Sequence, residues 1–180
     1  MILLDPDLDP DPAPQTKPAK TVASAGLSTR SLALFLRKAQ TSVRLRGQVS
    51  VLLTTDAAVR KLNRQFRGMN KATDVLSFPA EPIPGFKGSE QPAGDLAISV
   101  ETARKQAAAF AHPLGTELKV LVLHGLLHLA GYDHEIDGGE MAKREGTLRA
   151  KLGLPLGLIE RAASEPASQQ VSNSARRRTP

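Results

Sequence analysis

The chain of 180 residues contains no cysteine and no tryptophan, and aromatic side chains make up only 3% of it. Without cysteine it can form neither a disulfide nor a thiolate metal site, so nitrogen and oxygen must hold any metal that it binds. The scarcity of aromatic residues argues against a sheet of the RNA-recognition-motif type, which stacks bases on exposed rings. Any contact with nucleic acid is therefore expected to be directed mainly at phosphates.

Long hydrophobic runs are also missing. No stretch is long and apolar enough to cross a bilayer. The acidic start, MILLDPDLDPDP, lacks the basic residues and the longer apolar run of a secretory signal. We therefore predict a cytoplasmic protein with no membrane partner. The formal net charge of +6 and the pI of about 9.9 favour polyanionic partners such as RNA, although a merely soluble basic surface would look the same.

The composition predicts one domain between two arms. Apolar residues make up 41% of the chain, which at this length is enough for a single packed core. Residues 1–20 are rich in Asp and Pro and are predicted to form a flexible arm, in which Ile2–Leu4 could still form a short edge strand. Residues 162–180 contain few apolar residues and are predicted to be a disordered basic tail. The domain itself is expected to span residues 21–161.

Hydrophobic periodicity and capping residues indicate a mixture of helices and strands between the arms. Strands are expected at residues 49–53, 74–78 and 95–99. Helices are expected at residues 28–40, from residue 55 or 56 onward, and at residues 99–112, 116–130 and 138–152. Proline and glycine predict a loop over residues 81–94. The predicted fold class is α+β, with a small mixed sheet of three or four strands packed against about five helices.

One of these helices carries two of the four histidines. Its sequence, LKVLVLHGLLHLA, is apolar on nearly every side, which predicts a central buried helix that Gly131 can end. His124 and His128 are four residues apart, so they lie about 40° apart around the helix axis and about 6 Å apart along it. Their imidazoles therefore project from one face and can hold one ion.

A third histidine follows the glycine. Gly131 lets the chain leave the helix, so that His134 can turn back as a third ligand. Three neutral imidazoles suit Zn²⁺ and leave a fourth position for water, as in catalytic zinc sites, although imidazole also suits nickel, copper and iron. Burying these rings without a metal would leave several polar groups unpaired. The pattern predicts a hydrolase with one zinc-type ion per chain.

The spacing H-x₃-H-x₂-G-x₂-H resembles that of the metzincin metalloproteases. Those enzymes place a glutamate directly after the first histidine, where it acts as the general base of peptide hydrolysis. Here that position is Gly125. A metallopeptidase, or another metal hydrolase of small substrates, is an alternative that the spacing favours and Gly125 opposes.

A longer set of motifs resembles one family. HGLLHLAGYDH, the upstream segment LNRQFRGMNKATDVLSFP and the intervening GDLAIS are similar to the bacterial YbeY endoribonucleases, which are rRNA maturation factors. The resemblance covers about residues 49–154 and does not extend to the two arms. It implies a zinc-dependent, single-strand-specific endoribonuclease that acts in 16S rRNA 3′-end maturation and in ribosome quality control. It also implies RNA and ribosomal particles as partners, with ribosomal proteins or an assembly GTPase as candidate protein partners.

The resemblance assigns roles to four residues. It maps the family's metal ligands to His124, His128 and His134, and its functional arginine to Arg67. These residue types suit RNA cleavage, because a guanidinium can bind a phosphodiester through two hydrogen bonds and a metal can lower the pKa of its bound water to about 7. Either a metal-bound hydroxide or the RNA 2′-hydroxyl could be the nucleophile. A non-catalytic ribosome assembly factor, whose metal only stabilises the fold, is a further alternative.

Basic residues around Arg67 are candidates for phosphate contacts, although a solvated helix face would explain most of them equally well. These residues are Arg60, Lys61, Arg64 and Lys71. Other polar residues near the motifs are expected to have structural roles.

Asp133 could orient a histidine ring, but the favoured interpretation is that it braces a turn. We expect Asp74 to brace the backbone, Tyr132 to pack, and His112 to lie at a helix end without binding metal.

Overall fold

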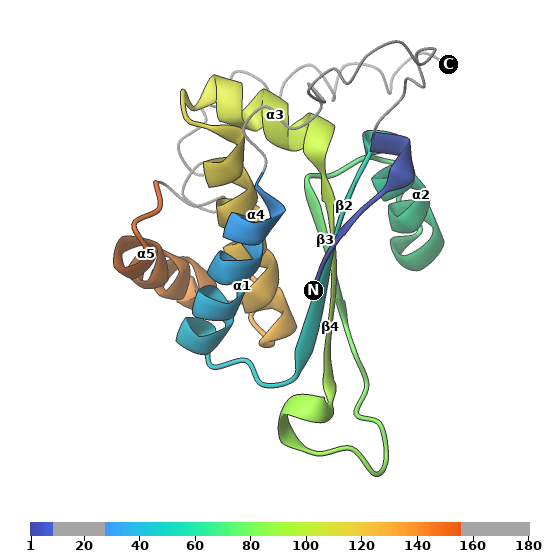
Figure 1. The fold of residues 1–180 in the computed structure, drawn as a ribbon, viewed down its shortest axis with the longest axis vertical. Helices are drawn as coiled ribbons and strands as arrows, with labels where there is room; N and C mark the ends of the chain where they lie inside the picture. Colours follow the sequence, from blue (N-terminus) through green and yellow to red (C-terminus); the bar gives the residue numbers. More distant parts are fainter. Residues whose placement is uncertain (9–27, 156–180) are drawn as a thin grey trace, which may run out of the picture.

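A computed structural model describes residues 1–8 and 28–155 (Figure 1). Four strands, five α-helices and two short 3₁₀-helices form in these ranges, which confirms the predicted α+β class. In chain order the elements are β1 (Ile2–Leu4), η1 (Pro6–Leu8), α1 (Thr29–Val43), β2 (Gln48–Thr54), α2 (Asp56–Arg67), β3 (Val75–Pro79), η3 (Gly88–Glu90), β4 (Pro92–Ser99), α3 (Val100–Ala109), α4 (Leu114–Leu129) and α5 (Glu140–Leu152).

The sheet is mixed, and its strand order is β1-β2-β4-β3. Strands β1 and β4 both run parallel to β2, whereas β3 runs antiparallel to β4. The short edge strand expected at Ile2–Leu4 is confirmed, because it pairs in register with residues 51–53 of β2. The other predicted arm residues, 9–20, and the predicted tail, 162–180, lie outside the described residues, so the domain boundaries stay a prediction.

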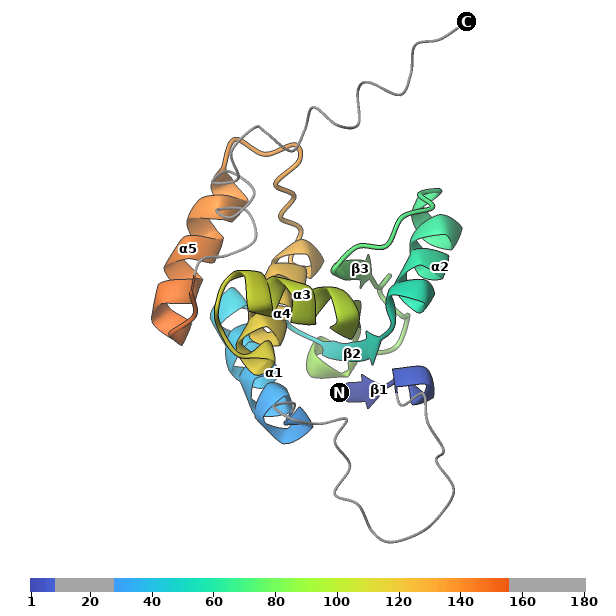
Figure 2. The ribbon, with the colours of Figure 1, turned by 90° about the horizontal axis from the view of Figure 1, so that it is seen from above.

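The sheet separates two unequal layers of helices (Figure 2). Helix α2 covers one face, over a small apolar cluster of Val59, Leu76 and Ala97. Helices α1, α3 and α4 cover the other face over the main core, and α5 packs on the outer side of α4. Alternation along β4 produces this division, because Ala97 faces α2 while Leu96 and Ile98 belong to the main core.

Helix α4 is the central element of the larger layer, as its apolar sequence predicts. It contacts α1, α3, α5, β3 and β4, and nearly every residue from Glu117 to Leu127 is buried. The helix begins two residues earlier than expected, directly after Pro113, and ends at Leu129. None of the helices in the described part of the chain is both long enough and apolar enough to cross a membrane.

Two boundaries differ from the sequence-based expectation for reasons of tertiary packing. Strand β4 begins at Pro92, so residues 92–94 were wrongly assigned to a loop; they form a strand because they pair with β2. Helix α3 ends at Ala109 rather than near residue 112. Phe110 lies just beyond the helix and is 41% exposed, and Ala111 then adopts a left-handed conformation.

Gly94 is the point at which β3, β4 and the end of α4 approach most closely. Its φ is +143°, a value that side-chain-bearing residues rarely adopt. A Cβ atom there would lie 2.4 Å from the carbonyl oxygen of Phe78 and 2.7 Å from Cδ2 of Leu129. The backbone of β3 cannot yield without breaking its pairing with β4, so this junction requires glycine.

We expect Gly94→Ala to destabilise the protein by about 2–4 kcal/mol, because it adds both backbone strain and a clash with the backbone. Urea unfolding followed by circular dichroism measures this change. Gly138→Ala is the matched control, since a Cβ there meets nothing within 4 Å and its φ is not positive. Equal unfolding midpoints for the two variants would contradict the account of Gly94.

Candidate metal centre

The three histidines predicted to form a site lie together. His124 and His128 come from the last turns of α4, and His134 comes from the segment that follows it. One ring nitrogen from each lies within 4.8 Å of the others. The Nε2 atoms of His124 and His128 are 3.1 Å apart, and the ring centroids of the three pairs are 4.8–5.3 Å apart. The sequence-based prediction of a three-histidine cluster is confirmed.

The turn after α4 places His134. Gly131 has a φ of +90°, and its N–H donates to the carbonyl of His128 at 3.0 Å. The Asp133 carboxylate accepts a hydrogen bond from the backbone N–H of Glu135 at 3.0 Å, so Asp133 braces this turn as expected. Tyr132 packs against the main core, which confirms its predicted role. Local backbone interactions therefore return the chain toward α4.

A second carboxylate connects the turn to α5. The Asp137 side chain accepts hydrogen bonds from the backbone N–H groups of Gly139 and Met141, both at 2.8 Å. These bonds, led by that from Met141, hold the pKa of Asp137 below its usual value. The segment that carries His134 is thus fixed at both ends, by α4 before it and by the start of α5 after it.

His128 has a lowered pKa, which favours metal binding over protonation. Burial, followed by the neighbouring His124 and His134, lowers the pKa of His128 to about 4. His128 is therefore neutral near pH 7, and its lone pair is available. Zinc bound to two imidazoles at about 2.0–2.1 Å in tetrahedral geometry places their nitrogens about 3.4 Å apart, close to the separation of the two Nε2 atoms. His124 is buried but His134 is exposed, so one side of the cluster is open to solvent.

Gly125 faces the sheet rather than the histidine cluster. A Cβ atom on it would lie 2.7 Å from Cδ2 of Leu96 and 3.3 Å from the Ser77 hydroxyl. Leu96 is itself buried in the main core. A glutamate in this position would have to enter the packed contact between α4 and the sheet. The residue that metzincin proteases use as their base therefore has no room here.

Arg67 lies on a different helix from the histidines. It is the last residue of α2, and its side chain is exposed. The neighbouring Phe66 packs edge-on against Phe78 of β3, with ring centroids 5.2 Å apart. The preceding residue of β3, Ser77, faces α4 instead, with its hydroxyl 3.4 Å from the Gly125 carbonyl. Helix α2, which ends at Arg67, and helix α4, which carries His124 and His128, therefore pack on opposite faces of the sheet (Figure 2).

The fourth histidine lies elsewhere, as expected. His112 forms an ion pair with Glu117 in the first turn of α4, with 2.9 Å between Nε2 and Oε2. Asp74 also has its predicted bracing role, since its carboxylate accepts hydrogen bonds from the backbone of Val75 and from the Gln106 side chain.

Two acidic residues, Glu117 and Glu145, are buried, which was not predicted from the sequence. A signal existed for Glu145, because it lies at helical spacing between the apolar Met141 and Leu148.

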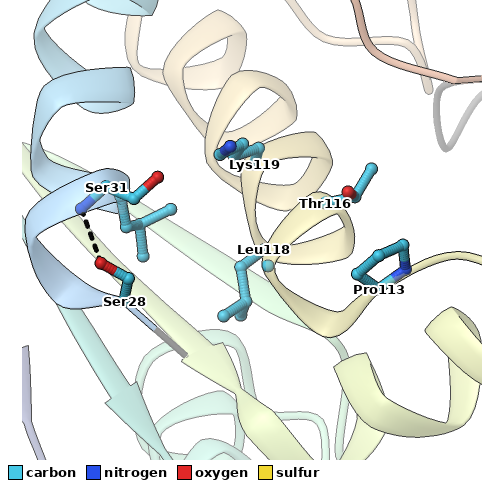
Figure 3. Close-up of a pocket in the computed structure, with 8 residues that line it drawn as sticks. Ser28, Ser31, Pro113, Thr116, Leu118 and Lys119 are labelled. Atoms are coloured by element: carbon cyan, nitrogen blue, oxygen red, sulfur yellow. Dashed lines mark hydrogen bonds between the residues drawn. The ribbon is translucent and has the colours of Figure 1, made fainter. Parts of the chain in front are cut away.

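A cavity of about 200 Å³ lies at the opposite end of α4 from the histidines (Figure 3). It is formed where the N-terminal ends of α1 and α4 meet. Its lining residues are Ser28, Ser31, Leu32, Pro113, Gly115, Thr116, Leu118 and Lys119. Its lining on α4 ends at Lys119, more than one helical turn before His124, and includes none of the three histidines, so the cavity is not part of the metal centre.

Comparison with known proteins identifies similar sequences over most of the chain. The family model described as Endoribonuclease YbeY matches residues 15–153. The Endoribonuclease YbeY of Koribacter versatilis is 49% identical over 152 residues, which cover 84% of this chain and 95% of that protein. The protein of the same name from Solibacter usitatus is 49% identical over 142 residues, covering 79% and 91% of the two chains.

Among solved structures, the solution structure of TM1509 from Thermotoga maritima is 24% identical and aligns with a TM-score of 0.47. The alignment covers 86% of this chain and 93% of that one.

We expect His128→Ala to weaken Zn²⁺ binding by at least about 100-fold, because it removes one of three ligands from the cluster. Competition with a chromophoric chelator measures the affinity. The matched control is His112→Ala, which removes a histidine outside the cluster and should leave the affinity unchanged. Equal losses in both variants, or no loss in His128→Ala, would contradict the assignment of the metal centre.

Proposed function

The chain belongs to the endoribonuclease YbeY family, and from this membership we propose that it is a zinc-dependent, single-strand-specific endoribonuclease. We further propose that it acts in the maturation of the 3′ end of 16S rRNA and in ribosome quality control. The observation that carries the proposal is the three-histidine cluster, which lies within the segment that the family model matches. The chain also covers nearly the full length of its relative from Koribacter versatilis.

His124, His128 and His134 are the proposed ligands of one Zn²⁺ ion per chain. Zinc is favoured because the cluster supplies three imidazoles, no thiolate and no carboxylate ligand, with one side open to solvent. When bound, such an ion can polarise a phosphoryl oxygen and lower the pKa of a bound water to about 7. The chain contributes a neutral His128 that needs no deprotonation before it binds the ion.

The RNA strand is proposed to pass over the edge of the sheet at β3. Helix α4, which carries His124 and His128, packs on one face of this strand, and α2 packs on the other. Exposed basic side chains follow α2 and the loop after it: Arg60, Lys61, Arg64, Arg67 and Lys71. Their positive charge would attract the phosphates of a strand without selecting its bases.

Arg67 is the proposed catalytic arginine. It is the basic residue at the very end of α2, and its guanidinium is exposed and available for a substrate. A guanidinium can make two parallel hydrogen bonds to a phosphate and stabilise the charge that grows on it during cleavage. In the proposed arrangement Arg67 binds the phosphodiester at the edge strand β3, next to the ion that the three histidines would hold.

Gly125 opposes the metallopeptidase alternative, because the packing against Leu96 leaves no place for the usual base. The proposed partners are therefore RNA and ribosomal particles, with ribosomal proteins or an assembly GTPase as candidate protein partners and the cytoplasm as the proposed location. A non-catalytic assembly factor would bind the same particles without cutting RNA, so a cleavage assay separates the two functions.

Cleavage of a labelled single-stranded RNA by the metal-loaded protein tests the proposal. We expect cleavage to stop when a chelator removes the metal and to return when Zn²⁺ is restored, while a matched duplex is spared. Undiminished cleavage after complete metal removal would overturn the proposed mechanism. A metal-loaded protein that binds RNA but never cleaves it would favour the assembly-factor alternative.

We expect Arg67→Ala to slow single-turnover RNA cleavage by about 100-fold or more, as the loss of a group that stabilises transition-state charge does. Its Zn²⁺ affinity should stay within about twofold of the wild type, since Arg67 is not one of the three proposed ligands. Arg37→Ala on α1 is the matched control, because it removes an equally exposed arginine from another helix. Equal cleavage rates for Arg67→Ala and Arg37→Ala would show that Arg67 is not the catalytic arginine.

Binding of single-stranded RNA should weaken steeply with salt, because phosphate contacts release counterions. If three to five of the basic residues along α2 contact phosphates, the slope of log affinity against log salt should be about −2 to −4. Fluorescence anisotropy of labelled RNA with the metal-loaded wild-type protein at several KCl concentrations measures the slope. A slope near zero would contradict phosphate-led binding.

A further inference from the structure

Glu145 is a buried acidic residue without a hydrogen bond. It lies on α5 and is 1% exposed, and neither of its carboxylate oxygens has a hydrogen-bond partner among the described residues. The residues one helical turn to either side, Met141 and Leu148, are part of the main core. A carboxylate in such surroundings is costly unless a partner compensates for the lost water.

The compensating group is His124. Its Nδ1 atom lies 3.7 Å from Oε1 of Glu145 and is itself buried without a hydrogen bond. The other ring nitrogen of His124, Nε2, points into the histidine cluster, 3.1 Å from Nε2 of His128. The His124 ring therefore lies between the cluster on one side and the Glu145 carboxylate on the other.

The needs of the two residues are complementary. A neutral imidazole carries one proton, so a His124 that binds a metal through Nε2 must carry its proton on Nδ1. That N–H is a donor, and the nearby Glu145 carboxylate is an acceptor without a donor. A shift of less than about 1 Å would convert their 3.7 Å separation into a hydrogen bond.

We propose that Glu145 is a positioning residue of the metal centre, which accepts a hydrogen bond from Nδ1–H of His124 and so presents Nε2 to the ion. The carboxylate fixes the tautomer and the ring orientation of the ligand and increases its basicity. This inference rests on the proposed metal site. It also gives α5 a role beyond packing, because α5 supplies the carboxylate of Glu145 next to Nδ1 of His124.

Two substitutions separate positioning from packing. Glu145→Met keeps the length of the side chain but removes the acceptor, and should weaken Zn²⁺ binding about 10–100-fold. Glu145→Gln keeps one acceptor oxygen without the charge, and should lose less. Glu140→Gln is the matched control, because it removes an exposed carboxylate from the first turn of the same helix, and it should bind Zn²⁺ like the wild type.

Chelator competition gives the Zn²⁺ affinity, and urea unfolding of the metal-free proteins gives the stability of the fold. A positioning role predicts weaker binding of Zn²⁺ by Glu145→Met while the metal-free fold remains intact. Affinity within twofold of the wild type in Glu145→Met would overturn the proposal, provided that His124→Ala binds weakly. Unchanged affinity in His124→Ala would overturn both the proposal and the metal site on which it rests.

A measurement on the wild-type protein does not depend on how the variants fold. Nitrogen-15 NMR of the Zn²⁺-loaded protein reports which ring nitrogen of His124 carries the proton. A protonated Nδ1 in a hydrogen bond supports the proposal, whereas a metal-bound Nδ1 overturns it. Absence of RNA cleavage in a protein that shows the protonated Nδ1 would refute the proposed function and leave the role of Glu145 supported.

Discussion

The burial of helix α4 determines the direction in which its two histidines point. The helix is surrounded by α1, α3, α5 and the sheet, so it cannot rotate without displacing packed side chains. Gly125 defines the contact with the sheet, because only a residue without a Cβ fits against Leu96 and Ser77. With that face of the helix fixed, His124 and His128 are directed toward the turn that carries His134 and toward α5.

The segment after α4 completes the centre with short-range interactions. Backbone hydrogen bonds to Asp133 and Asp137 hold the turn, and Asp137 also caps α5. Because α5 starts at this point and packs back on α4, its second turn brings Glu145 next to His124. One continuous stretch of chain thus supplies all three proposed ligands and the carboxylate that supports the first of them. The edge strand β3 separates this centre from the basic helix α2.

Local features of the sequence were sufficient to predict most elements and the histidine cluster. The 3.6-residue period of α4 and the turn at Gly131 depend on neighbours in the chain, so the grouping of His124, His128 and His134 could be predicted. The role of Arg67 came from a family resemblance and stays a prediction. No periodicity could show that α2 and α4 pack on opposite faces of the sheet, because that depends on tertiary contacts.

Features that depend on tertiary contacts were missed. Strand β4 extends back to Pro92 only because β2 lies beside it, and a proline-rich and glycine-rich segment gives no local sign of this pairing. The burial of Glu145 depends on the packing of α5 against α4, which places its carboxylate next to Nδ1 of His124. The helical spacing of Glu145 with Met141 and Leu148 indicates an apolar face, but nothing in the sequence shows that His124 lies beside it.

X-ray absorption at the zinc edge of the loaded full-length protein tests the metal centre most directly, because it reports the atoms that surround the ion. Three imidazole nitrogens at about 2.0–2.1 Å, with one further oxygen ligand, are the expected first shell. A shell with one imidazole or none, made up mainly of oxygen atoms, would contradict the assignment of His124, His128 and His134.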